Sequence, residues 1–308
     1  MPDQWAGIAL RFATYVDLTI LFGVPLFAIQ VLDPQDHATW ISRRYARLVA
    51  AAGAIGIALA LLGLAALALE MTGSDDVSAV TRNALATILL RTGAGVAWAA
   101  RVGALGVGLI ALAMLRNRPR TLFHALAVTG GIALATAGWA GHGAMDDGVR
   151  GYVHLGSDVL HLLAAGAWIG ALAAFVFMSL APPASDDHSV DLLNRTAAGF
   201  GRIGTAIVAI LLVSGTINYG LIARANWSPL LSTLYGNLLI AKLAVFVLML
   251  SLAGANRFLL GPRLRSALAA GDHAQAARTL VRSLRTEAAL GLLVLALVAW
   301  LGVLSPET

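Results

Sequence analysis

The chain contains no cysteine and few charged residues, and both absences narrow what it can be. Without cysteine it has no disulfide, no thiolate metal ligand and no cysteine redox chemistry. Any bound metal would need His, Met, Asp, Glu or backbone ligands. Charged residues fill 12% of the 308 positions, whereas soluble domains carry roughly 25%. A water-exposed globular domain is therefore excluded as the main fold.

Strand-like patterns and nucleotide-binding motifs are also missing. No stretch sustains the alternation of a β-strand, and no GxxxxGK[ST] motif is present. Long runs rich in Leu, Ala and Gly dominate instead, and the mean hydropathy is +0.81. Because lipid leaves helices as the best way to satisfy the backbone, we predict an all-α transmembrane helical bundle. ATP hydrolysis is not expected, and we predict a binding or transport protein rather than an enzyme.

About eight apolar runs have the roughly 20 residues needed to cross a bilayer. The first is too long and too charged to be a removable signal peptide, so we expect it to be retained. Apolar residues at partly helical spacing also predict a short surface helix within 70–91. We expect one membrane domain over 1–308, with a three-span part at 1–120 and a five-span part at 121–308. The predicted spans are 7–32, 46–69, 92–115, 121–140, 152–180, 200–223, 235–260 and 286–304.

Arginines gather in alternate loops, namely those after the first, third, fifth and seventh predicted spans. Positively charged loops stay in the cytoplasm, so this pattern places both termini on the periplasmic side. The net charge of +5 then reflects membrane topology. The expected surroundings are a lipid bilayer, and no nucleic-acid partner is expected.

The fifth run carries the most informative polar residues. His154, Asp158 and His161 lie in its first third. A helix turns about 100° per residue, so Asp158 lies about 40° and His161 about 20° from His154. All three therefore share one face, and ionisable residues within a membrane span suggest a functional site. Trp168 continues this face, where we interpret it as a packing residue.

A short turn before this run adds two possible metal ligands, His142 and Met145. The predicted topology places them outside, near His154, and a cluster of His and Met favours copper. His154 and His161 are about 10 Å apart along the helix, too far to share one ion easily. Either His142 and His154 form an outer site with His161 deeper on a path, or Asp158 orients one of the imidazoles.

Other ionisable residues lie within or near predicted spans. Asp17 and Arg101 fall at similar estimated depth, so we predict an ion pair between them. Lys242 lies about two turns inside the seventh span, where it either faces a polar interior or extends to the surface. Glu287 falls at the start of the eighth predicted span, and we interpret it as an interfacial residue.

Taken together, these residues resemble the CopD family of bacterial copper-resistance inner-membrane proteins. The resemblance covers most of the chain and is strongest from about residue 121 onward. It is carried by the order and spacing of several segments: GAGVAWAAR ending at Arg101, the GHG turn, His154, HLLAAGAWIGAL at 161–172, Phe200, SGTIN at 214–218, LYGNLLIAKLAVFVLML at 234–250, Asn256-Arg257, Pro262, Arg282 and Glu287.

The resemblance implies a polytopic inner-membrane protein that moves copper from periplasm to cytoplasm with a periplasmic CopC-type carrier. No CopC-like domain is present in the sequence, so that carrier would be a separate protein. In this interpretation His142, His154 and His161 are ligands in an outward-facing cavity, and Met145 and Asp158 support them. Two alternatives remain: a b-type haem membrane oxidoreductase, with haem held by histidines on facing spans, and a scaffold or assembly factor without transport.

Overall fold

The computed structural model describes residues 2–73, 81–140, 148–180, 187–223 and 233–304. These residues form helices and no strand. The longer helices are α1 (Pro2–Val31), α2 (Trp40–Thr72), α4 (Gly93–Met114), α5 (Pro119–Ala135), α6 (Gly148–Ser179), α7 (Asp187–Ala223), α9 (Leu234–Ala255) and α11 (Ala274–Leu301). The shorter ones are η1 (Asp36–Ala38), α3 (Arg82–Arg91), η3 (Thr136–Ala140), η5 (Asn256–Leu260) and α10 (Gly261–Ala269).

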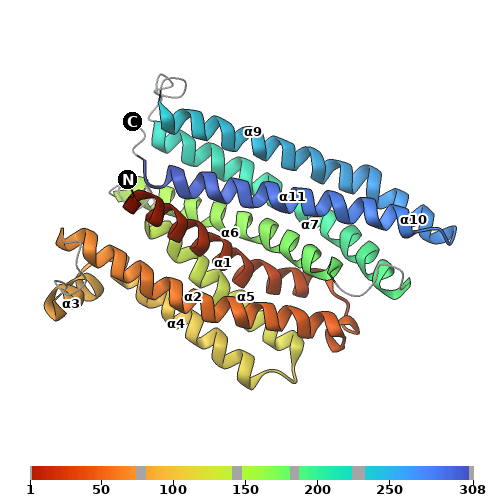
Figure 1. The fold of residues 1–308 in the computed structure, drawn as a ribbon, viewed down its shortest axis with the longest axis horizontal. Helices are drawn as coiled ribbons and strands as arrows, with labels where there is room; N and C mark the ends of the chain where they lie inside the picture. Colours follow the sequence, from red (N-terminus) through yellow and green to blue (C-terminus); the bar gives the residue numbers. More distant parts are fainter. Residues whose placement is uncertain (1, 74–80, 141–147, 181–186, 224–232, 305–308) are drawn as a thin grey trace.

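The predicted membrane bundle is confirmed. Among the described residues, eight helical segments are long and apolar enough to cross a membrane. One of these eight segments, Leu234–Ala269, consists of α9, η5 and α10 in continuous succession. The first and last spans begin and end at the same end of the bundle, where the Trp5 and Trp300 rings lie 5.4 Å apart between centroids (Figure 1). The predicted short helix within 70–91 is α3, whose first turn is capped by the Thr81 hydroxyl.

Two helices begin well before the predicted spans. α11 begins at Ala274 rather than near 286, and α7 begins at Asp187 rather than near 200. The added turns of α11 carry arginines, which lower the local hydropathy, yet they bury Ala277, Leu280 and Leu284 at helical spacing. An apolar run therefore marks where a helix enters lipid, and not where the helix starts.

α1 lies at the centre of the bundle, between α2, α5, α6 and α11 (Figure 1). Glycines allow its close approach to two neighbours. A Cβ on Gly23 of α1 would lie 2.2 Å from the Gly166 carbonyl oxygen of α6, and one on Gly170 would lie 2.3 Å from the Gly23 Cα. A Cβ on Gly130 of α5 would lie 2.4 Å from the Leu21 carbonyl oxygen. Such backbone contact between helices is typical of membrane bundles.

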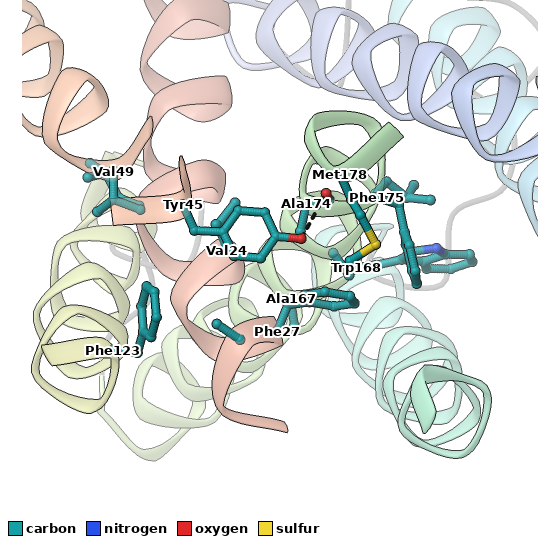
Figure 2. Close-up of a cluster of buried hydrophobic side chains, with 14 of the residues drawn as sticks. Val24, Phe27, Tyr45, Val49, Phe123, Ala167, Trp168, Ala174, Phe175 and Met178 are labelled. Carbon is teal, nitrogen blue, oxygen red and sulfur yellow. Dashed lines mark hydrogen bonds between the residues drawn. The ribbon is translucent and has the colours of Figure 1, made fainter. Parts of the chain in front are cut away.

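Aromatic side chains fill the core between α1, α2 and α6 (Figure 2). Phe27 of α1 meets Phe175 of α6 edge to face, with 4.8 Å between ring centroids. Tyr45 of α2 is fully buried, and its hydroxyl donates a 3.0 Å hydrogen bond to the Ala174 carbonyl oxygen of α6. Partnering that hydroxyl removes the cost of burying it and fixes α2 against α6.

The connection between α1 and α2 packs against two other helices. Arg195 of α7 bonds Asp36 and Asp33 of the connection, as well as Asp191 one turn before it. His37 is 7% exposed, and its ring lies 5.9 Å from that of Phe123 on α5 between centroids. Burial lowers the pKa of His37 from its ordinary 6.5, and nearby Arg120 lowers it further.

This burial predicts a loss of stability in mild acid. Unfolding exposes His37 and restores its ordinary pKa, so the unfolded chain binds the proton first as the pH falls below about 6.5. The unfolding temperature of the detergent-solubilised protein should therefore fall as the pH is lowered from about 7 to 5. His37→Gln should weaken this dependence. Equal curves for wild type and His37→Gln would contradict the prediction.

Candidate functional site

The polar residues of α6 face α7, the next helix along the chain. Asp158 and His161 both bond α7 side chains, so they share a face as the sequence predicts. His154, two turns before His161, is 2% exposed. The Ser157 hydroxyl, on the same side, donates to the Ser214 carbonyl oxygen of α7 at 3.3 Å. A polar seam therefore joins the two helices inside an otherwise apolar bundle.

His161 is held in one orientation by Ser214. The His161 Nδ1 atom lies 3.0 Å from the Ser214 Oγ atom, and this hydroxyl donates its only proton to the Ile210 carbonyl oxygen at 2.6 Å. The Ser214 Oγ atom can then only accept, so Nδ1 of His161 carries the proton. Its Nε2 atom keeps a lone pair, which is the form that binds metals. Gly215 lies against the ring, where an added Cβ would be in van der Waals contact with the His161 Cε1 atom at 3.4 Å.

Asp158 occupies the same seam one turn earlier. Its Oδ1 atom accepts a 2.9 Å hydrogen bond from the Asn218 amide of α7. Lys242 of α9 lies close enough to interact electrostatically with both Asp158 and His161. Lys242 thus faces the interior of the bundle, one of the two placements that the sequence leaves open. A carboxylate and an ammonium so placed balance each other's charge in a medium of low polarity.

His161 opens onto a cavity of about 320 Å³ between α6, α7 and α9. Apolar side chains form most of its wall, including Trp168 and Phe246, whose rings lie 5.8 Å apart between centroids. Thr216, Tyr219 and Lys242 are its other polar lining residues besides His161. The His161 imidazole is therefore adjacent to a space that can admit a small ligand.

Glu287 forms a second polar centre, whose contacts the sequence interpretation of it as an interfacial residue does not include. This residue of α11 is 2% exposed and does not lie at a helix end. Its Oε1 atom accepts from the Trp168 indole at 2.9 Å, and its Oε2 atom accepts from the Asn256 amide at 2.8 Å. Asn256 begins a π-helical turn, a feature that is frequent at functional sites. Glu287 thereby joins α6, α11 and the end of α9.

The predicted ion pair between Asp17 and Arg101 is wrong. The Arg101 Nε atom donates to the Thr136 hydroxyl at 2.9 Å. Asp17 is 5% exposed, and its Oδ2 atom is buried without a hydrogen-bond partner in the described part of the chain. That atom lies against Gly56 of α2, where an added Cβ would be 2.6 Å away. Residue counting along a span does not give the direction in which a side chain points.

The other predicted ligands cannot be placed with these residues. His142 and Met145 lie outside the described residues, so their pairing with His154 stays a prediction. Within the described ranges, no group of three or more His, Asp or Glu is placed to hold a metal ion. The role of Ser214 is not evident from the sequence alone. The sequence feature that could have indicated it is the four-residue spacing between Ser214 and Asn218, which puts two small polar residues on one face of an apolar helix.

Comparison with known proteins identifies the family. The family described as "Copper resistance protein D-like, N-terminal domain" matches residues 1–152, and "Copper resistance protein D" matches residues 194–301. The chain is also 39% identical to Copper resistance protein D of Pseudomonas syringae pv. tomato, over 98% of this chain and 97% of that protein. The chain belongs to the copper resistance protein D family. The resemblance drawn from the sequence is confirmed, and with its eight apolar helices the chain is a multi-pass copper resistance membrane protein.

The chain is similar to two further proteins. The chain is 31% identical to the Inner membrane protein YebZ of Escherichia coli (strain K12), over 97% of this chain and 98% of that protein. It is 33% identical to the Copper transport protein CutJ of Bacillus subtilis (strain 168), over 54% of this chain and 27% of that protein. No solved structure matches the chain. The division of the chain at residue 120 stays a prediction.

Proposed function

We propose that this member of the copper resistance protein D family binds copper in the seam between α6 and α7 and moves it across the bacterial inner membrane. The observation that carries the proposal is the His161 imidazole, which Ser214 holds at Nδ1 and which lines an interior cavity. An imidazole nitrogen suits copper, and a ligand that is already oriented loses little freedom on binding.

Several steps of this function follow from the positions of the polar residues. The arginine-rich loops favour a topology with both termini in the periplasm, so α6 begins on the periplasmic side. His142, Met145 and His154 would receive copper there, and His161 would bind it one step deeper. Asp158 is a counter-charge for the cation and for Lys242. A separate CopC-type carrier would deliver the copper, and a gradient or transfer to another protein would drive its movement.

Metal analysis and a visible spectrum of the purified protein test the proposal. We expect bound copper in the wild type and at least a tenfold loss of affinity in separate Ala variants of His142, His154 and His161. Ser214→Ala should lose about 10- to 100-fold, because it releases the ring that it orients. His124→Ala is the matched control, because His124 is exposed and, among the described residues, bonds the Arg120 carbonyl oxygen of its own helix alone. Copper uptake into liposomes that contain each variant then tests transport.

The same measurements separate the alternatives. A Soret band that His161→Ala removes would replace copper with haem b and support the oxidoreductase. Protein without copper or haem would support the scaffold. Tight copper binding without uptake into liposomes would restrict the proposal to binding.

A further inference from the structure

A second cavity lies at the opposite end of the bundle from the α6 histidines, where α6 ends and α7 and α11 begin. It has a volume of about 650 Å³. Three arginines of α11, Arg278, Arg282 and Arg285, line it. Their spacing of four and three residues puts all three guanidinium groups on one face of the helix. The cavity therefore has one strongly basic wall.

The arginines differ in how they are held. Arg285 donates from Nε and Nη2 to the Ser179 hydroxyl, at 3.2 Å and 3.1 Å, and from Nη2 to the Ser179 carbonyl oxygen at 3.3 Å. The guanidinium groups of Arg278 and Arg282 have no hydrogen bond or ion pair with any residue that the structure describes. Within the same ranges, no carboxylate lines the cavity. Two cations thus face a space in which no described carboxylate neutralises them.

The rest of the lining is mostly apolar. Met178, Val190, Leu193, Val281 and Ala289 line the cavity beside the arginines. The arginines lie at or just before residue 286, where the long apolar run of α11 starts. They are thus at the depth of lipid headgroups, with the apolar lining extending towards the acyl chains. A free phosphate would satisfy the arginines but would leave this apolar wall uncovered.

We propose that this cavity binds an anionic phospholipid, with its phosphate at Arg278 and Arg282 and the start of one acyl chain against Leu193 and Ala289. Basic pockets between membrane helices suit such headgroups, because arginine bonds phosphate through two parallel N–H groups. The bound lipid would join α6, α7 and α11 at an end of the bundle where Arg285 and Ser179 bond α11 to α6 directly.

Native mass spectrometry of the full chain tests this site, with phosphatidylglycerol, phosphatidylcholine and inorganic phosphate as separate probes. We expect retained phosphatidylglycerol, and a loss of about 25-fold in the R278Q/R282Q variant, or roughly fivefold for each arginine. The matched control is R263Q/R265Q, which removes the same charge from α10, outside the cavity. All of these arginines are exposed, so the fold should tolerate the changes.

A further variant separates the sources of phosphate. Ala289→Trp should fill the apolar part of the cavity and reduce retention of phosphatidylglycerol while leaving the arginines in place. Equal losses in R278Q/R282Q and R263Q/R265Q would overturn the proposal in favour of general surface charge. Equal retention of phosphatidylcholine would overturn it in favour of unspecific lipid. Binding of inorganic phosphate that Ala289→Trp leaves unchanged, without retained phosphatidylglycerol, would overturn it in favour of a free-anion site.

Discussion

Gly170→Leu should prevent the bundle from assembling. Gly170 of α6 touches the backbone of α1, and even a Cβ there would lie 2.3 Å from the Gly23 Cα and 2.7 Å from the Thr19 carbonyl oxygen. No side-chain movement relieves a clash between two backbones, so α1 would have to leave its place. Since α1 packs against α2, α5, α6 and α11, the core around Phe27 would open. We expect little monodisperse protein by size-exclusion chromatography in detergent.

The matched control is Gly156→Leu on the same helix. Gly156 is exposed, and nothing lies within 4 Å of an added Cβ. Leu is also a better helix former than Gly by several tenths of a kcal/mol, so this variant should be at least as stable as the wild type. If Gly170→Leu and Gly156→Leu gave the same yield and the same unfolding temperature, the close packing of α1 on α6 would be refuted.

Glu287→Leu should be the most destabilising change in the interior of α11. It keeps the approximate volume of the side chain but removes the acceptor for both the Trp168 indole and the Asn256 amide. Each buried donor that is left without an acceptor costs about 1–3 kcal/mol. The loss should appear in equilibrium unfolding of the purified protein in detergent, and it should loosen the contact of α11 with α6 and with the end of α9.

Glu287→Gln tests whether hydrogen bonding, rather than charge, is what the site requires. Its amide oxygen can still accept from Trp168. Its amide nitrogen can donate to Asn256 once that side chain reverses, because the Asn256 Oδ1 atom is buried and has no other partner among the described residues. We therefore expect Glu287→Gln to cost about 1 kcal/mol or less. A loss as large as that of Glu287→Leu would show that the ionised carboxylate itself is needed.

Hydropathy was sufficient to predict the number of spans, because each long apolar run must form a helix that satisfies its own backbone in lipid. Helical periodicity was likewise sufficient to place Asp158 and His161 on one face. Both predictions depend on geometry within one helix. The wrong predictions depend on geometry between helices or on the length of a helix.

Glu287 shows the effect of helix length. A span predicted from 286 places the residue near the start of a helix, but the helix begins twelve residues earlier, so Glu287 lies near its middle and contacts other helices. Asp17 and Arg101 show the effect of geometry between helices. The rotation of α1 turns Asp17 towards α2, and the rotation of α4 turns Arg101 towards η3. In the sequence, Ser214 stands out only as part of a family motif. Its role is to orient the His161 ring, and His161 lies 53 residues away in sequence. Such relations depend on packing that one sequence does not specify.

The long hairpin of α10 and α11 has a practical consequence for imaging. The segment Leu234–Ala269 and the 28 residues of α11 would be about 54 Å and 42 Å long, more than the roughly 30 Å of hydrocarbon. Their linked ends therefore stand clear of the bilayer, joined by four residues that include Gly271 at a φ of 74°. Buried Leu264 and Leu280 belong to the core of the bundle, so this projection is a stiff part of the molecule. A soluble fusion partner inserted at 270–273 would be carried in a fixed orientation, which gives a chain of 31.9 kDa a rigid marker for particle alignment in electron microscopy.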